Sequence, residues 1–339
     1  MSSRLFVFIL PVVVIAIFWA MARRESKLAH DPTHKSFFKR NGTSLGIVYI
    51  LLVAFWALFL VTLPYLYMVV ESFHPKLPPA QRGGPTDVLT IAQYKSFFVN
   101  PIDNEVNGTH IYAFVFSILA SVAVTALNFA ICYPIAYYMA QAGTAQKVRL
   151  LMLGLIVPYW VNEILRAFAL RLLLASKGLI NQMLMGIHVI SDPIPWLADP
   201  FWAKVVVISA ITWRWTGYNM IFYLAAMQNI DRSIYEAARI DGVPASARFW
   251  KITVPMLKPV ILFTSVISTI GTLQLFDEPN LLTAGGPSDS TLTLSLYIYN
   301  LSFKFMPSFG YAATVSYVIV VLVGLLSLVQ FVLARDRRG

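Results

Sequence analysis

Long apolar runs alternate with short polar segments along most of the chain. Seven such runs can be distinguished, at residues 5–22, 46–71, 111–140, 149–174, 201–229, 257–283 and 310–334. A run of about 18 or more apolar residues can cross the roughly 30 Å of hydrocarbon in a bilayer. Inside a bilayer each run must be helical, because a helix satisfies its own backbone hydrogen bonds. The pattern therefore predicts an all-α membrane protein with about seven transmembrane helices.

Composition and charge agree with this fold class. Of the 339 residues, 58% are hydrophobic and 12% charged, about half the charged fraction of a soluble domain. The net charge of +10 would suit nucleic-acid binding, but Lys and Arg lie in short segments between the apolar runs, as the positive-inside rule describes. We therefore expect membrane lipid around the chain and no nucleic-acid partner. With a single cysteine, Cys132, and five scattered histidines, neither a disulfide framework nor a metal site is expected.

The basic residues also predict the orientation. Segment 23–44 is basic and follows the first apolar run, so we place it in the cytoplasm. Alternation then puts the loop at 230–256 inside, together with the basic residues near Lys147 and Arg335. The outer loops are 72–110, 175–200 and 284–309.

The first apolar run, 5–22, has two interpretations. It is short and nearly N-terminal, as in a cleaved signal peptide. We favour a retained helix, because no small-x-small cleavage site follows the run and the flank after it is more basic than the flank before it. Residues 1–45 then form an extra N-terminal helix with a basic cytoplasmic linker, and residues 46–339 form the main membrane domain.

The loop at 231–256 has its own local structure. Asp231 and Ser233 are candidate helix N-caps, and a short helix is predicted over about 233–241, ending at Gly242. Four residues of this helix should lie near one face: Ile234, Ala237, Ala238 and Asp241. Pro244 cannot continue the helix, a second helix should begin over 245–251, and Pro255 should close the unit. On composition alone, an ordinary amphipathic turn at the membrane surface is the simpler interpretation.

The spacing of residues in this loop is more specific than its composition. Glu236-Ala237-Ala238, three residues, Gly242, nine residues and then Ile252-x-Val254-Pro255 resemble the signature of binding-protein-dependent ABC importer permeases, with Val254 where Leu is commoner. In that family the loop is a coupling helix that docks into a groove on a cytoplasmic ATPase. The resemblance implies this coupling role for Glu236, Ala237, Ala238, Gly242, Ile252 and Pro255.

The resemblance covers roughly residues 110–335 and implies a type I ABC importer permease core in the bacterial inner membrane. Its implied partners are a second permease subunit (as a heterodimer), two ABC ATPase subunits and a periplasmic or lipid-anchored solute-binding protein. ATP and Mg would be bound by the ATPase, and the chain itself contains no G-x-x-x-x-G-K-[ST] motif. We therefore expect no catalytic residue here.

Two branches of the family are represented. Phe276-Asp277, Gly285-Gly286-Pro287 and Gly217-Tyr218-Asn219-Met220 resemble carbohydrate-type permeases. Segment 156–162, with Arg166 and Ser176-Lys177-Gly178, resembles polyamine-type permeases instead. A sugar, polyol or glycerol-type solute is favoured, with a polyamine as the alternative.

Polar groups inside the apolar runs are costly and therefore mark a candidate translocation path. The candidates are Glu163, Arg166, Arg214, Tyr218, Asn219, Gln274, Phe276 and Asp277. Glu163 and Arg166 are three residues apart, so they share a helix face and can pair, and such a pair could equally be only structural. Nearby arginines disfavour a cation and could bind hydroxyls or an anionic sugar derivative.

Two other classes of membrane protein agree less well with the sequence. A secondary transporter would be expected to show inverted repeats with broken helices, which the sequence does not reveal. A membrane enzyme would need a nucleophile and a base, or a metal set, facing one compartment, and no histidine accompanies the carboxylates in the apolar runs. Neither class explains the loop at 231–256.

Overall fold

The computed structural model describes residues 49, 51–75, 77, 81, 84–85, 87–100, 104–141, 144–305 and 307–334. The predicted run at 5–22, the linker at 23–44 and the basic residues at 335–338 lie outside this part of the chain. Over the described residues the fold is helical, and its only strand-like feature is an isolated bridge between Val99 and Val106. The chain divides after Tyr67 into two units, and the helices from α4 onward belong to the second.

Three described helices are long and apolar enough to span a bilayer, or up to five if each of two bent pairs counts as one span. The three are Leu51–Ser72, which includes the π-helical turn η1 (Ala57–Thr62) and α3 (Leu63–Ser72), α5 (Gly108–Gln141) and α15 (Phe309–Ala334). Their bounds agree closely with the predicted runs. α9 (Pro200–Gln228) matches the run at 201–229 and is 29 residues long, although its hydropathy does not place it among the five.

The predicted span at 149–174 is wrong as a single helix. The chain forms α6 (Ala145–Trp160) and α7 (Glu163–Leu173), which meet at 99°. Val161 is extended, and the Asn162 side chain accepts hydrogen bonds from the backbone N–H groups of Ile164 (2.9 Å) and Leu165 (3.4 Å), so it caps the new helix. An Asn cap of this kind satisfies donors that a continuous helix would have bonded itself, which is why hydrophobicity alone did not reveal the bend.

The predicted span at 257–283 is also shorter than expected. α13 runs over Lys258–Leu273, and a π-helical turn, η4 (Pro279–Thr283), follows a short non-helical segment. The Thr293 hydroxyl donates to the Leu275 carbonyl at 2.7 Å, so it satisfies one backbone group in the non-helical segment.

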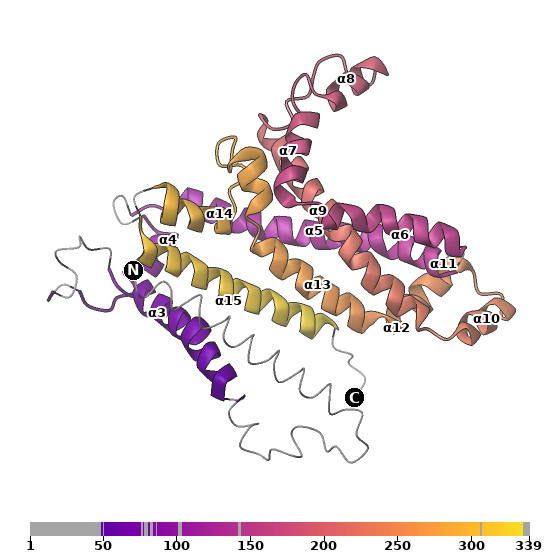
Figure 1. Ribbon diagram of the computed structural model, residues 1–339, viewed down its shortest axis with the longest axis horizontal. Helices are drawn as coiled ribbons and strands as arrows, with labels where there is room; N and C mark the ends of the chain where they lie inside the picture. The colour runs from indigo at the N-terminus through magenta and orange to yellow at the C-terminus, as the bar shows by residue number, and fades with distance from the viewer. Residues whose placement is uncertain are drawn as a thin grey trace, which may run out of the picture. The chain divides into compact units, whose positions relative to one another are not determined.

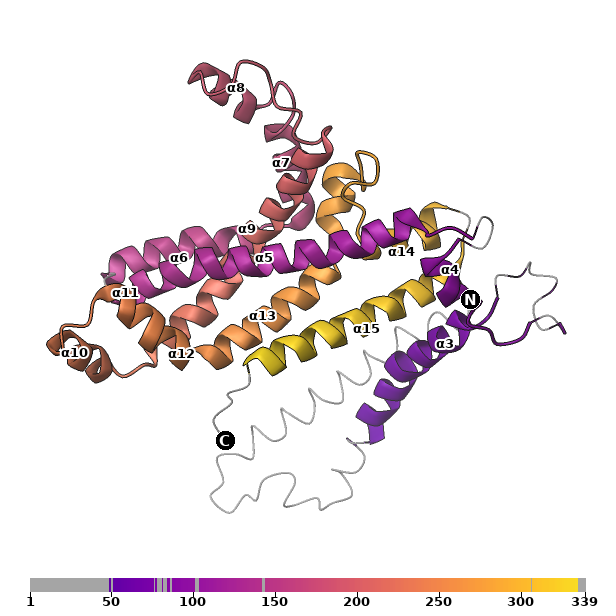
Figure 2. The ribbon, with the colours of Figure 1, turned by 180° about the vertical axis from the view of Figure 1, so that it is seen from behind.

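α9 packs along α5, with α6 and α13 beside it (Figures 1 and 2). The core between them is apolar, with Cys132, Tyr133 and Met220 fully buried. α6 approaches α9 closely at Gly217, where an added Cβ would lie 2.2 Å from the Leu155 carbonyl oxygen. This glycine therefore sets the distance between two helix backbones.

Shorter helices lie between the long ones. They are α4 (Ala92–Phe98), α8 (Leu179–Gly186), α14 (Leu294–Tyr299) and the π-helical turn η5 (Asn300–Lys304). In both views α7 and α8 extend away from the bundle (Figures 1 and 2). The fully buried Asn181 side chain organises this extension, because its oxygen accepts from Ile194 N and Trp196 Nε1 and its amide nitrogen donates to the Ile194 carbonyl at 3.0 Å.

We expect Gly217→Ala to destabilise the protein by about 1–3 kcal/mol, the usual cost of overpacking, because the new methyl group meets backbone that cannot rotate away. Gly154→Ala is the matched control on α6, since a Cβ there meets nothing within 4 Å; it should be neutral or slightly stabilising. Unfolding in detergent, followed by circular dichroism, measures both. Equal stabilities of the two variants would contradict the close approach.

Candidate functional site

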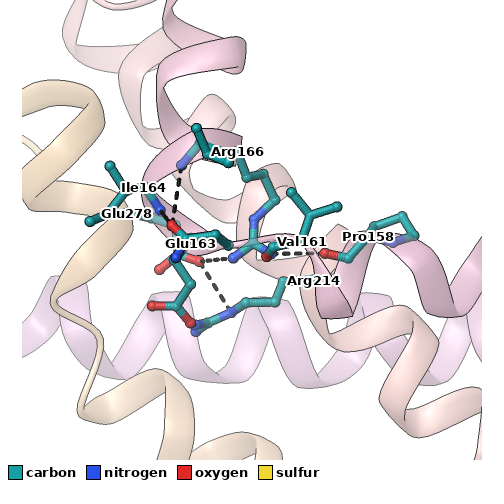
Figure 3. A network of polar contacts seen from close by, with 9 residues as sticks. Pro158, Val161, Glu163, Ile164, Arg166, Arg214 and Glu278 are labelled. Atoms are coloured by element: carbon teal, nitrogen blue, oxygen red, sulfur yellow. Dashed lines mark hydrogen bonds and ion pairs between the residues drawn. The ribbon is translucent and has the colours of Figure 1, made fainter.

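A network of ion pairs joins α7, α9 and the segment after α13 (Figure 3). Glu163, the first residue of α7, accepts a hydrogen bond of 2.6 Å from Arg214 Nη1 on α9. Arg214 Nε also lies 3.1 Å from Glu278 Oε1, and Glu278 lies 3.7 Å from Arg166 Nη2. The four side chains form one chain of alternating charges that begins and ends on α7.

Arg166 also supports the bend between α6 and α7. Its side chain is 4% exposed, and its Nη1 donates to the carbonyl oxygens of Pro158 (2.9 Å) and Val161 (3.4 Å) (Figure 3). These carbonyls lie where α6 ends. Irregular backbone inside a membrane is tolerated only where its polar groups are satisfied, so Arg166 has a structural role at the bend.

Glu278 is the least satisfied member of the network. Its side chain is 5% exposed, and neither carboxylate oxygen has a hydrogen bond of good geometry within the described part of the chain. Its two ionic contacts therefore compensate its charge without saturating its oxygens. A buried acceptor in this condition has capacity for a further donor.

The pairing differs from the sequence prediction. Glu163 and Arg166 do share α7, but the ion pair of Glu163 is formed with Arg214 and that of Arg166 with Glu278. Glu278 was not among the predicted path residues, although it lies at the centre of the network. The sequence could have indicated Glu278, because it is a second carboxylate directly after Asp277. In the structure Asp277 lies against Glu163.

The other predicted path residues lie in three different surroundings. Tyr218 packs its ring against Tyr159 and Trp215, at 5.7 and 5.4 Å between centroids. Asn219 is buried, and its side-chain oxygen has no partner among the described residues. Gln274 is exposed and Phe276 is half-buried. The structure thus brings Glu163, Arg166, Arg214 and Asp277 together, and it leaves the remaining four outside the ion pairs.

The described residues contain no group of three or more His, Cys, Asp or Glu that could hold a metal ion.

The second candidate region is the loop at 231–256, which the sequence predicts to be cytoplasmic. α10 covers Arg232–Ile240 and is capped by Asp231, whose carboxylate accepts from Ser233 N at 2.9 Å. This backbone hydrogen bond holds the pKa of Asp231 below its ordinary value. Because the folded-state pKa is lowered, the contribution of the cap to stability is present at neutral pH and is lost as the pH falls through that lowered pKa. Gly242 has φ +71°, so it ends the helix in the left-handed conformation as predicted.

The predicted common face of this helix is only partly correct. Tyr235 and Ala238 are buried and Ile234 is half-buried, whereas Ala237 and Asp241 are exposed. The reason is the helical period: Ala237 and Ala238 are adjacent, so about 100° separates them around the axis. Glu236 and Ala237 therefore belong to the free surface.

The second half of the loop is more helical than predicted. α11 (Ala245–Arg248), the π-helical turn η3 (Phe249–Thr253) and α12 (Val254–Met256) follow one another directly. Ile252 is half-buried. Pro255 was expected to close the unit, but it lies at the start of α12, where proline is well tolerated. The chain bends later, at Leu257, by 72°.

Aromatic and hydroxyl contacts connect this loop to the membrane helices. The hydroxyls of Tyr235 on α10 and Thr253 on η3 are 2.9 Å apart. Phe249 packs edge-on against Tyr133 of α5, with 5.1 Å between ring centroids. Tyr133 packs against Tyr223 of α9, whose hydroxyl is 2.8 Å from that of Thr264 on α13.

Comparison with known proteins gives consistent results. The family model described as binding-protein-dependent transport system inner membrane component matches residues 133–338. The chain is 70% identical to the lactose transport system permease protein of Rhizobium radiobacter over 163 residues, which are 48% of this chain and 55% of that protein. It is 37% identical to the sulfoquinovosyl glycerol transport system permease protein of Agrobacterium fabrum over 42% of this chain and 45% of that protein. The chain thus spans about half the length of these curated relatives.

A solved structure shows the same fold. A chain of a bacterial ABC transporter involved in the import of the acidic polysaccharide alginate superposes with a TM-score of 0.70 and 21% identity, covering 88% of this chain and 97% of that chain. The similarity confirms the predicted all-α membrane fold.

We expect Glu278→Gln and Glu163→Gln to behave differently. Glu278 is buried between two arginines, and breaking a buried pair costs about 3–5 kcal/mol. Glu163 is 45% exposed, and exposed pairs contribute only about 0–1 kcal/mol. Thermal unfolding of the purified variants should therefore show a large loss for Glu278→Gln and little for Glu163→Gln. The reverse order would contradict the assigned network.

Proposed function

Because the chain belongs to the family of binding-protein-dependent transport system inner membrane components, we propose that it is the permease subunit of an ATP-driven importer for a neutral sugar, polyol or glycerol-type solute. The chain lies in the inner membrane. The family is a transport component, and we assign ATP and Mg to a separate ATPase subunit.

The observation that carries the proposal is the construction of the cytoplasmic loop. A short capped helix, α10, ends at a left-handed glycine and presents Glu236 and Ala237 on its free side. Its other side is held through Tyr235, Thr253 and Ala238. A surface that is free on one side and firmly attached on the other can transmit a force from a bound partner, which is what coupling to an ATPase requires.

The route for this force is the chain of aromatic contacts. Tyr235 and Thr253 connect α10 to η3, and Phe249, Tyr133 and Tyr223 continue from η3 to α5 and α9. Closely packed cores transmit displacement because they are not easily compressed. We propose that closure of two ATPase subunits draws the loop inward and that the membrane helices respond as rigid bodies, switching between two states.

The charges of the polar network favour a neutral solute. Arg166 and Arg214 are already paired with Glu278 and Glu163, so their guanidinium groups are not available for bidentate binding of an anion. Glu278 retains acceptor capacity that a sugar or polyol hydroxyl could fill. The named substrates of the relatives, lactose and sulfoquinovosyl glycerol, support the sugar branch over the polyamine branch, and the first of them supports a neutral sugar.

The proposed assembly contains a second permease subunit in a heterodimer, two ABC ATPase subunits and a periplasmic or lipid-anchored solute-binding protein. A related solved transporter is described in complex with an alginate-pentasaccharide-bound periplasmic protein, which supports the last of these partners.

We expect Gly242→Asp to abolish ATP-driven uptake while the protein still inserts in the membrane, because it places a carboxylate on the docking surface, at a turn with φ +71°. Gly242→Asn is the control, since Asn and Asp both tolerate the left-handed conformation and Asn adds no charge; it should retain most uptake. Uptake of radiolabelled lactose into proteoliposomes containing the whole complex measures this. Full uptake by Gly242→Asp would refute the coupling role.

The solute class is tested by stimulation of ATP hydrolysis in the reconstituted complex with its binding protein. Lactose or a polyol should stimulate hydrolysis, whereas spermidine and an alginate oligosaccharide should not. Stimulation by spermidine alone would favour the polyamine branch, and stimulation by alginate alone would show that the paired arginines become available during transport.

A further inference from the structure

A cleft of about 820 Å³ lies at the cytoplasmic side, beside the coupling helix α10. Its walls come from the end of α5, the start of α6, the end of α9 and one side of α10. The floor is apolar and includes Met139, Met227 and Ile230. The polar lining consists of Gln141, Arg149, Gln228, Arg232, Glu236 and Arg239.

The charge of this lining is unbalanced. Three arginines, Arg149, Arg232 and Arg239, face one carboxylate, Glu236, which leaves a formal excess of two positive charges (three minus one). Within the described residues, none of the three guanidinium groups has an ion pair or a side-chain hydrogen bond. Arg248 of the same loop differs, because its Nη1 donates to the Val243 carbonyl at 2.9 Å.

The three arginines lie on two different helices. Arg232 and Arg239 lie on α10, whereas Arg149 lies on α6 and outside the coupling loop. A guanidinium group offers a planar set of donors that matches a carboxylate or a phosphate in a bidentate manner. The cleft therefore has donors on two elements that an anionic group could bridge.

We propose that this cleft receives carboxylate side chains of the ATPase subunit and is a second attachment point, which adjoins the free surface of α10 and shares Glu236 with it. The proposal rests on the proposed function, and it identifies a contact on α6 that the coupling loop alone would not require. A protein partner suits the mixed lining better than a lipid phosphate, because it can present a cation to Glu236 and carboxylates to the arginines at once. Such a contact would tie α6 and α10 to the same moving subunit.

The test uses the full chain in its complex with the ATPase, in nanodiscs of phosphatidylcholine. Retention of the ATPase is measured as the salt concentration is raised. Arg149→Gln should release the ATPase at lower salt and weaken its binding by up to about fivefold, as expected for one exposed ion pair. Arg149→Lys keeps the charge but not the planar donors. It should release the ATPase at a salt concentration between those of Arg149→Gln and the unmodified protein.

Lys147→Gln is the matched control, since Lys147 is exposed on α6, two residues before Arg149, and does not line the cleft; it should behave as the unmodified protein. Monodisperse elution of Arg149→Gln would show that the variant is folded. Unchanged retention by a folded Arg149→Gln, or an equal loss with Lys147→Gln, would overturn the proposal. So would an effect of Arg149→Gln that appears only when phosphatidylglycerol is included, because it would identify the headgroup of an anionic lipid as the ligand.

Failure of this proposal can be distinguished from failure of the proposed function. If Gly242→Asp abolishes uptake while Arg149→Gln retains the ATPase normally, the coupling role stands and only the second attachment point is refuted. If Gly242→Asp has no effect on uptake, the proposed function itself is refuted.

Discussion

The arrangement of the membrane domain depends on how the backbone freed at the α6–α7 bend is satisfied. Inside a bilayer an unpaired carbonyl is costly, and the guanidinium group of Arg166 accommodates two of them, those of Pro158 and Val161. A buried cation is itself unfavourable unless paired, so Glu278 is required beside it, and Glu278 in turn brings in Arg214 and Glu163. One break in a helix thus accounts for four charged residues. The same network positions a half-exposed carboxylate, Glu163, at the start of α7.

The loop at 231–256 depends on a different kind of contact, because α10 is exposed on one side and attached on the other. Aromatic side chains attach it by contacting several helices at once: Tyr133 touches Phe249 and Tyr223, and Tyr235 meets Thr253. Hydroxyl pairs are directional, which fixes the orientation of α10 as well as its position. The ion-pair network and the loop at 231–256 are therefore joined through α9, which carries both Arg214 and Tyr223.

Much of this was readable from the sequence, for identifiable reasons. Apolar runs located α5, α9 and α15 because hydrophobicity must extend across the whole bilayer, and Asp231 and Gly242 bounded α10 because caps and left-handed turns need particular residue types. The bend at Asn162 was not predicted from the sequence, because the residues around it remain apolar and only the side-chain cap of α7 marks it. The ion-pair partners within the polar network were predicted incorrectly. Spacing shows that Glu163 and Arg166 share a helix face, but it gives no information about partners on other helices, and those partners form the observed ion pairs.

The π-helical turn η3 (Phe249–Thr253) has a consequence for the direction in which later residues point. A π turn accommodates one residue more than an α-helical turn, and one residue corresponds to about 100° of rotation around a helix axis. Residues after Thr253 are therefore rotated relative to those before Phe249, compared with an uninterrupted α-helix. Removing a single residue from this turn would realign the two faces, and Phe249 and Thr253 could no longer meet Tyr133 and Tyr235 together. The length of this segment should accordingly be more restricted than its side-chain identities.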